Sequence, residues 1–297
     1  MLTAFSAGLL GCAGLPATLE DEAPAVRMLD VRGASLELQF APGLAAAQLA
    51  WATAWVMRCA EAVAAYFGRF PLPQIEVLVV VEAGERVLGG ASFAEPSPLL
   101  RLRLGDKVTQ AAFNEDWILV HEMVHLAVPR LARAHNWLHE GLATYIEGLA
   151  RGRAGWVGAQ AVWHSWTRQM PLGQPRPGEA GLDQTPTWAR TYWGGALFCL
   201  LADVRLRQQG SPQRGLQQAL QGVLAAGGDF RVVWPVTQVF ACADAALGQT
   251  TLRDLYAAMK DDAVAIDLAA LWRDLGVGET TLHDNAPLAA IRRAILA

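Results

Sequence analysis

Two stretches in the first third of the chain alternate between apolar and polar side chains. Residues 29–40 do so with Leu36, Leu38 and Phe40 on one face, and residues 100–104 alternate strictly between leucine and arginine. A period of two places successive side chains on opposite faces of an extended chain. Each stretch therefore predicts a strand with one buried face.

The segments between and after these strands predict both further strands and helices. Residues 74–82 are almost continuously apolar, which predicts a buried central strand. Residues 44–67 are rich in alanine and predict a long buried helix, because two charged side chains make a membrane span a poorer fit. Residues 89–93 predict a loop that enters another strand, and after Gly105 the pattern becomes helical.

These elements predict an α+β protein, and its length of 297 residues favours two lobes. Residues 21–128 are expected to form a mixed N-terminal lobe with a small sheet, and residues 129–297 a mostly helical C-terminal lobe. Residues 168–188 are rich in proline and glycine, and a loop of that length inside a compact protein is usually functional or mobile.

The composition argues against several classes of function. Apolar residues make up 53% of the chain and charged residues 18%, which is too apolar for a disordered protein. The net charge of −4 argues against a nucleic-acid binder that neutralises phosphates. No CxxC pair occurs among the four cysteines, which predicts buried thiols rather than a cysteine zinc site. They are Cys12, Cys59, Cys199 and Cys242.

Residues 1–20 contain a candidate targeting signal. No charged side chain precedes Glu20, and Leu9–Cys12 resembles the bacterial lipoprotein box, in which the cysteine is lipidated after cleavage. This interpretation predicts membrane attachment through Cys12 and a location in the bacterial cell envelope. No basic residue precedes the apolar stretch, which favours the alternative of an ordinary apolar tail on a cytoplasmic protein.

Residues 121–125 form an HExxH motif. Positions i and i+4 of a helix share one face, so His121 and His125 can reach the same zinc ion. Glu122 would lie beside that ion and polarise a bound water. The flanking apolar residues suit a helix, with Asn114 as the expected N-terminal cap. The alternative is a buried helix whose histidines are incidental.

Zinc needs a third protein ligand and an open position for water. The metzincin pattern is absent, because Val128 and Leu131 stand where it requires glycine and histidine. Pro129 ends the first helix, and residues 137–147 have the spacing of a second one. An antiparallel return of the chain would bring Glu140, near the start of that second helix, to the metal.

Two further side chains of the second helix belong to the candidate site. Glu147 shares a helical face with Glu140, so it can accept a hydrogen bond from a ligand histidine. The alternative for Glu147 is a solvated surface acid. His139 is a competing zinc ligand, although on a helix it points away from Glu140.

The two motifs together resemble those of the gluzincins, the HExxH…E zinc peptidases that include thermolysin and the aminopeptidases. Residues 137–147, WLHEGLATYIE, are similar to the aminopeptidase branch in particular. The resemblance implies a thermolysin-like zincin fold, a peptide or protein substrate, and one zinc ion held by His121, His125 and Glu140. It also implies that Glu147 supports one of these ligands.

Residues 191–207 look like a segment of the glycyl aminopeptidase family. In those enzymes a tyrosine at this helix start donates a hydrogen bond to the oxyanion, which implies that role for Tyr192. The alternative for Tyr192 is a buried aromatic side chain. The glycines that follow it permit a close approach of the helix to the site, which favours the functional role. Gly194 replaces the lysine of that pattern, and residues 251–255 are a weaker match. The resemblance covers roughly residues 89–260, which implies the catalytic domain alone.

The resemblance further implies an edge strand that binds substrate. The segment from Gly89 to Glu95 would dock a peptide backbone, with Gly90 and Ala91 supplying main-chain hydrogen bonds. Glu95 is the acid of this segment that would hold the α-ammonium group of an exopeptidase substrate. Arg190 is expected to be an ordinary solvated arginine.

Three functional hypotheses follow. The first is a zinc-dependent, aminopeptidase-like peptidase that hydrolyses peptide bonds with a metal-activated water. The second is an endopeptidase with the same metal centre, and the third is a zinc-binding protein of the same fold without turnover. Glu122 and Tyr192 favour the first two, because a structural zinc needs neither. The sequence specifies neither the substrate preference nor the oligomeric state.

Overall fold

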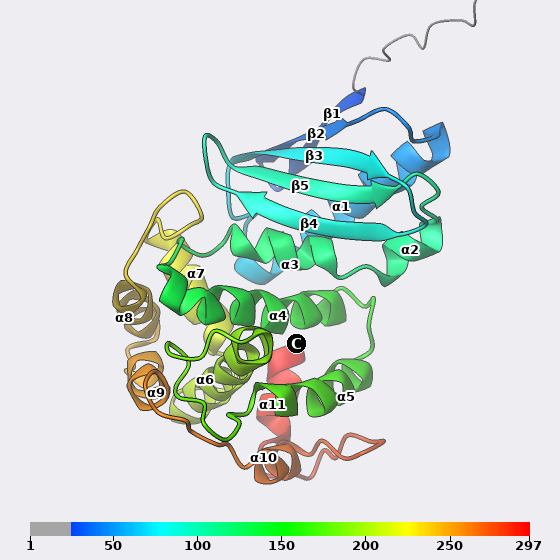
Figure 1. The fold of residues 1–297 in the computed structure, drawn as a ribbon. Coiled ribbons are helices and arrows are strands. Elements are labelled where there is room, and N and C mark those ends of the chain that lie inside the picture. Colours follow the sequence, from blue (N-terminus) through cyan, green and yellow to red (C-terminus); the bar gives the residue numbers. More distant parts are fainter. Residues whose placement is uncertain (1–24) are drawn as a thin grey trace, which may run out of the picture.

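The computed structural model describes residues 25–297, and its N-terminal part is built on one five-stranded sheet (Figure 1). The strand order is β1-β2-β3-β5-β4, so that β1 and β4 form the two edges. The central pairs β2–β3 and β3–β5 are parallel, and the outer pairs are antiparallel. The strands are β1 (Ala25–Val31), β2 (Ala34–Phe40), β3 (Gln74–Glu82), β4 (Val87–Phe93) and β5 (Leu99–Gly105).

The single strand predicted over residues 29–40 is a hairpin in the structure, which corrects the prediction. Val31 pairs with Ala34, so the turn between β1 and β2 consists of Arg32 and Gly33 alone. Both turn residues have positive φ, 52° and 84°, as a two-residue hairpin turn requires. Gly33 reaches this conformation without steric cost. The alternation of side chains continues through both strands and conceals the turn.

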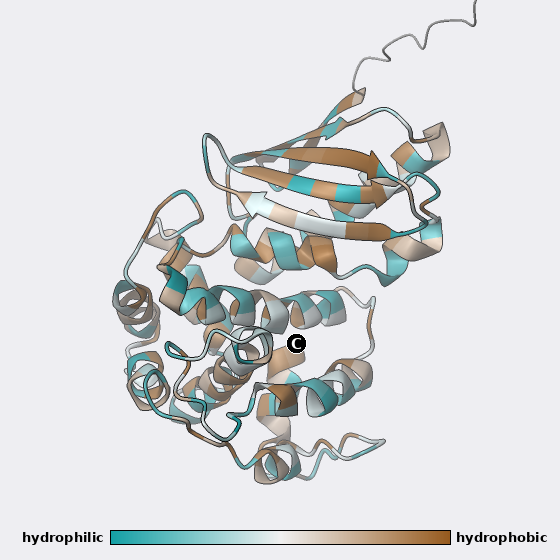
Figure 2. Cartoon of the chain, in the orientation of Figure 1, coloured by the Kyte–Doolittle hydropathy of each residue, from teal (hydrophilic) through white to brown (hydrophobic). Residues whose placement is uncertain are grey.

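Only one face of the sheet is buried. Val77 on β3 and Leu102 on β5 are fully buried, whereas the alternate residue Leu78 is partly exposed. Strand β3 confirms the central strand predicted over residues 74–82, but its second face is only partly buried. Figure 2 shows β3 as hydrophobic nearly throughout, next to the alternating β5. On the open face Leu78 lies between Gln39 and Arg101, whose long side chains shield it.

The buried face packs on helices. The long helix α1 (Ala46–Phe67) confirms the helix predicted for residues 44–67, and it buries Trp55, Val56 and Val63 in the core. Helices α2 (Gln110–Glu115) and α3 (Ile118–His125) follow the sheet. Helix α3 runs beneath the edge strand β4, with α4 on its other side (Figure 1).

The rest of the chain is helical, which confirms the predicted α+β arrangement of a mixed N-terminal lobe and a helical C-terminal lobe. Among residues 25–297, no helix combines the length and apolar character that crossing a bilayer requires. The helices are α4 (Asn136–Arg153), α5 (Ala159–Gln169), α6 (Gly195–Gln209), α7 (Leu216–Ala225), α8 (Val236–Leu247), α9 (Thr251–Met259), α10 (Leu268–Leu275) and α11 (Ala289–Leu296). Short turns of helix cover η1 (Arg133–His135), η2 (Met170–Gly173) and η3 (Arg190–Gly194), the last a π-helix.

The proline- and glycine-rich stretch 168–188 is anchored at Asp183. The Asp183 carboxylate accepts hydrogen bonds from the Trp137 indole at 2.7 Å and from the Tyr256 hydroxyl at 2.6 Å, and it lies 3.1 Å from His135 Nδ1. Trp137 is near the start of α4, so this contact fixes the stretch against the helix that carries Glu140.

The cysteines within the described residues are free thiols. Cys59 and Cys199 are buried and Cys242 is partly buried, which confirms the expectation of packed thiols. The lipidation predicted at Cys12, and the cellular location that depends on it, concern a residue outside residues 25–297. They stay predictions.

Candidate metal centre

Helix α3 begins at an aspartate cap. Asp116 accepts hydrogen bonds from the backbone N–H groups of Ile118 and Leu119, each at 3.1 Å. These are two of the donors that a helix start leaves without partners. The cap predicted at Asn114 is therefore wrong. Asn114 lies within α2 and accepts a hydrogen bond from Arg58 instead.

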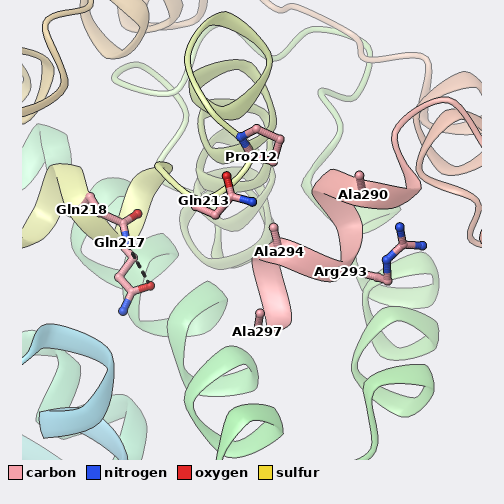
Figure 3. Close-up of a pocket in the computed structure, with 8 residues that line it drawn as sticks. All are labelled: Pro212, Gln213, Gln217, Gln218, Ala290, Arg293, Ala294 and Ala297. Carbon is pink, nitrogen blue, oxygen red and sulfur yellow. Dashed lines mark hydrogen bonds between the residues drawn. The ribbon is translucent and has the colours of Figure 1, made fainter.

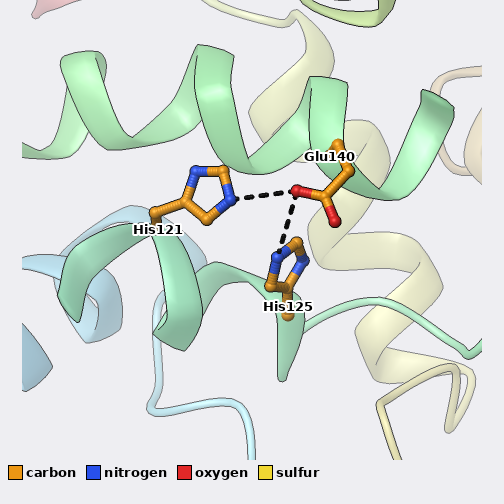
Figure 4. Close-up of side chains that lie close together, drawn as sticks. All are labelled: His121, His125 and Glu140. Atoms are coloured by element: carbon orange, nitrogen blue, oxygen red, sulfur yellow. Dashed lines mark hydrogen bonds and ion pairs between the residues drawn. The ribbon is translucent and has the colours of Figure 1, made fainter. Parts of the chain in front are cut away.

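Helical spacing on α3 brings the two motif histidines together. Their rings lie 4.9 Å apart, centre to centre, and both side chains point toward α4 (Figure 4). Leu119, Val120 and Met123 on the other faces of the helix are fully buried. The apolar faces thus hold α3 against the core, and the remaining face presents His121 and His125.

Glu140 on α4 closes the group. Its Oε2 atom lies 3.1 Å from His121 Nε2 and 3.7 Å from His125 Nε2. One candidate ligand atom of each of the three residues lies within 4.8 Å of the others. The structure therefore brings together the three ligands predicted from the motifs, from two different helices.

The donor set and its environment fit a zinc ion. Two imidazole nitrogens and one carboxylate oxygen form a zinc ligand set that leaves a fourth position for water. His121 and His125 are each only 5% exposed. Burial lowers the pKa of His125 well below its ordinary value, which keeps the ring in the neutral form that binds a metal.

Glu122 lies between the metal group and the edge strand β4. A Cβ atom added at Gly90 would lie 2.7 Å from Glu122 Cγ, so only glycine permits this approach of strand and helix. Burial raises the pKa of Glu122, and contact with Ser92 opposes the shift. The strand predicted to dock substrate through Gly90 and Ala91 therefore lies directly against the predicted catalytic acid, with its outer edge unpaired.

Tyr192 reaches the site from the π-helix η3. Its ring stacks on His121 at 6.1 Å between centroids, with 16° between the planes. Burial raises the pKa of Tyr192 to about 12, with a further contribution from the charge of Glu140. The hydroxyl is therefore protonated near neutral pH and available as a hydrogen-bond donor.

Two glycines bring Tyr192 to this position. A Cβ atom at Gly141 on α4 would lie 2.3 Å from the backbone of Gly195. A Cβ atom at Gly195 would lie 2.0 Å from the carbonyl oxygen of Trp137. The backbones of α4 and of the η3–α6 junction are thus in direct contact. The close approach inferred from the glycines after Tyr192 is confirmed, whereas the sequence did not identify Gly141 as the partner of Gly195.

No family profile and no curated protein matches the chain, but solved structures do. An aminopeptidase N family protein from Idiomarina loihiensis matches with a TM-score of 0.63 and 15% identity, over 86% of this chain and 49% of that one. An M1 zinc metallopeptidase from Deinococcus radiodurans matches with a TM-score of 0.51 and 20% identity, over 88% of this chain and 53% of that one.

A variant of a two-domain M1 zinc metallopeptidase, bound to L-arginine, matches with a TM-score of 0.53 and 18% identity. That match covers 79% of this chain and 51% of the other. The chain has the gluzincin, aminopeptidase-like fold. It spans about half the length of these M1 relatives. The predicted thermolysin-like zincin architecture is thereby confirmed.

The contacts of Glu147 on α4 differ from what the gluzincin resemblance implied. Glu147 accepts a hydrogen bond from Arg151 at 3.2 Å, one helical turn along, rather than from a histidine. It is partly buried, so it is not a solvated surface acid either. The Nδ1 atoms of His121 and His125 are buried, and no hydrogen-bond partner lies beside them within residues 25–297.

His139 packs against a ligand instead of competing with it. Its ring stacks on His125 at 4.4 Å between centroids, with 4° between the planes. Burial lowers the pKa of His139 to about 4, so the ring is neutral. His139 is not among the three residues whose ligand atoms converge. The stacked His139 ring therefore limits the orientations that the His125 ring can adopt.

The remaining predicted site residues have other partners. Arg190 is buried and donates a hydrogen bond to the Gly173 carbonyl, so the expectation of a solvated side chain is wrong. Glu95 is 73% exposed and forms an ion pair with Arg130 at 3.0 Å. The acid proposed to hold a substrate ammonium group is thus already engaged by a cation.

A surface pocket of about 540 Å³ lies away from the metal group, between the segment before α7 and the C-terminal helix α11 (Figure 3). Arg293 is its single ionisable side chain, and this guanidinium pairs with Asp284. The pocket has no nucleophile or acid–base pair. This pocket therefore offers no alternative to the His121–His125–Glu140 group as a candidate site.

Proposed function

We propose that the protein is a zinc-dependent peptidase that hydrolyses peptide bonds, most simply an aminopeptidase. The convergence of His121 Nε2, His125 Nε2 and Glu140 Oε2 carries this proposal. The likeness in fold to M1 zinc metallopeptidases supports it. A zinc ion held by these three side chains supplies a Lewis acid that polarises the scissile carbonyl and acidifies water.

Glu122 acts as the general base and then as the general acid. Its carboxylate accepts a proton from the attacking water and returns it to the nitrogen of the departing amine. The burial that raises the pKa of Glu122 makes the carboxylate a stronger base than an exposed glutamate. Its place beside β4 matches a peptide bond held along the open edge of that strand.

Tyr192 stabilises the negative charge that develops on the carbonyl oxygen. Its hydroxyl remains protonated near neutral pH, because burial raises its pKa to about 12. The stacked contact with His121 places the ring at the metal group before substrate binds. A donor fixed in advance stabilises the oxyanion without the cost of reorganisation.

An endopeptidase is the second candidate, and a specific ion pair favours it. An aminopeptidase needs a carboxylate for the α-ammonium group of its substrate. The acid predicted for this task, Glu95, is paired with Arg130. Comparing peptides with free and with acetylated N-termini separates the two activities. Cleavage of the acetylated peptides identifies an endopeptidase, and cleavage of the free peptides alone identifies an aminopeptidase.

A Glu122→Gln substitution tests the peptidase proposal. The variant keeps the size of the side chain and leaves all three metal ligands in place, so it should bind one zinc ion per chain. Peptide hydrolysis, followed by chromatography of a mixed peptide library, should fall by about 10²–10⁴-fold, the usual contribution of a general acid–base group. Wild-type zinc binding without hydrolysis of any peptide would instead indicate a binding protein.

A further inference from the structure

The tryptophans of this protein are distributed unevenly between its core and its surface. All eleven lie within residues 25–297, and nine are buried or partly buried. The two exposed ones are Trp117, at 48%, and Trp188, at 62%. A folded protein usually buries most of so large an apolar side chain, so two exposed indoles require an explanation.

Both exposed indoles contact the metal centre. Trp188 stacks on Tyr192 at 5.8 Å between centroids, with 26° between the planes. Trp117 meets His121 edge to face, at 5.6 Å and 82°. Because Tyr192 itself stacks on His121, the four rings form one continuous aromatic row. Each end of the row is an exposed indole, and its middle contains a metal ligand and the proposed oxyanion donor.

The two ends of the row come from different lobes. Trp117 immediately precedes α3, the helix beneath the sheet, and Trp188 lies two residues before the start of η3 in the helical lobe. The metal group lies between α3 and α4. A peptide bound along β4 over Glu122 extends its side chains alternately to either side of its backbone. Side chains next to the scissile bond are the ones that reach this row.

We infer that Trp117 and Trp188 form a substrate-binding surface that selects peptides with a large apolar side chain, aromatic or aliphatic, next to the scissile bond. The inference rests on the proposed peptidase function and adds a substrate class to it. Exposed indole faces gain most from stacking with rings or branched aliphatic groups. Glycine has no side chain to pack against these indoles, so we expect peptides with a small residue at this position to be poorer substrates.

Charge at the site supports an uncharged occupant. A lysine side chain could also sit on an indole through a cation–π contact, and an unengaged carboxylate nearby would strengthen its binding. Glu122 serves the proposed proton transfer beside β4, and Glu140 lies against the two histidines. Glu147 is paired with Arg151, and Glu95 with Arg130. Selection of lysine over phenylalanine would therefore contradict the inference.

The test uses three peptides that differ only in the residue next to the cleaved bond, which is phenylalanine, glycine or lysine. For the wild type, kcat/KM should be highest with phenylalanine. In Trp188→Ala the ratio of kcat/KM for the phenylalanine and glycine peptides should fall about tenfold or more, because the apolar contact is lost. Trp188→Phe should restore most of the ratio, and Trp117→Ala should lower it less, since Trp117 is less exposed.

Met28→Ala is the matched control, because Met28 is an equally exposed apolar side chain on the far edge strand β1. It should leave the ratio unchanged. A ratio that Trp188→Ala leaves unchanged, or a wild type that prefers glycine or lysine, would overturn the inference.

Equilibrium binding separates this inference from the proposed function. Zinc-loaded Glu122→Gln should bind the phenylalanine peptide more tightly than the glycine peptide in isothermal titration calorimetry. Adding Trp188→Ala should remove most of that difference. If the wild type cleaves no peptide but this tryptophan-dependent binding is observed, the peptidase proposal fails and the apolar surface stands. If the wild type cleaves peptides but their binding does not depend on Trp188, the peptidase proposal stands and the apolar surface is overturned.

Discussion

Helix α3 and the contact between α4 and the η3–α6 junction build the same metal centre in different ways. On α3, His121 and His125 are four residues apart, so one turn of helix brings their rings together. Tyr192 is fifty-two residues from Glu140 in sequence (192 − 140), and the contact of Gly141 with Gly195 brings their segments together. The first half of the site depends on local spacing and the second on close backbone packing.

This difference determines how each half responds to mutation. Replacing a side chain on α3 removes a functional group and leaves the helix in place, because the apolar residues of α3 hold it in the core. There is no room for an added methyl group between α4 and α6, because backbone atoms occupy the space on both sides. The second half should therefore be the more sensitive to small changes.

The largest expected effect comes from Gly141→Ala. The added Cβ would lie 2.3 Å from the Gly195 backbone, so α4 and α6 must move apart. We expect a loss of unfolding free energy of about 3 kcal/mol, the upper end of the usual cost of overpacking. Zinc affinity should fall as well, because Glu140 is the adjacent residue. Urea denaturation and zinc titration measure the two effects.

Gly148→Ala on the same helix is the matched control. A Cβ atom at Gly148 meets only side-chain atoms, the nearest of them on Trp166 at 3.6 Å. Replacing a glycine inside a helix by alanine there should raise the unfolding free energy by about 0.5–1 kcal/mol. Equal destabilisation by the two substitutions would show that close packing of α4 against α6 does not position this half of the site.

Tyr192→Phe should have the second largest effect. The substitution keeps the ring stacked on His121 and removes only the hydroxyl donor. We expect kcat to fall by about 10²–10³-fold with zinc content unchanged, the typical cost of one oxyanion donor. Steady-state kinetics on a cleaved peptide measure it. A change confined to KM would show that Tyr192 binds substrate without stabilising the oxyanion.

The contrast between the two halves also explains what the sequence predicted. The ligand set His121, His125 and Glu140 follows from helical spacing and a resemblance to gluzincin motifs, and the structure brings these residues together. The contact of Gly141 with Gly195 depends on three-dimensional packing, and no periodicity along the chain encodes it. The π-helix at Tyr192 was missed for the same reason.

The errors in the N-terminal lobe have local causes. The alternation of residues 29–40 continues through the Arg32–Gly33 turn, so one strand and a hairpin have the same pattern. The apolar run of β3 correctly indicated a central strand, but it did not show that only one face of this strand is fully buried. In each case the pattern correctly indicated a strand and did not specify its surroundings.

The smallest expected effect concerns the start of α3. Asp116→Ala removes the cap of the N–H groups of Ile118 and Leu119, so the unfolding free energy should fall by about 1 kcal/mol. Asn114→Ala, at the position that the sequence favoured, should change it by less than about 0.5 kcal/mol, as is usual for surface positions. Thermal denaturation of both variants measures the difference. A larger loss at Asn114 would restore the original assignment.

The central claim is that His121, His125 and Glu140 bind one zinc ion. X-ray absorption at the zinc edge, on protein loaded with one zinc per chain and on Glu140→Ala, tests it most directly. We predict two imidazole nitrogens and a carboxylate oxygen at about 2.0–2.2 Å in the wild type, and loss of the carboxylate contribution in the variant. A three-imidazole site that includes His139, or a spectrum that the variant leaves unchanged, would contradict the account.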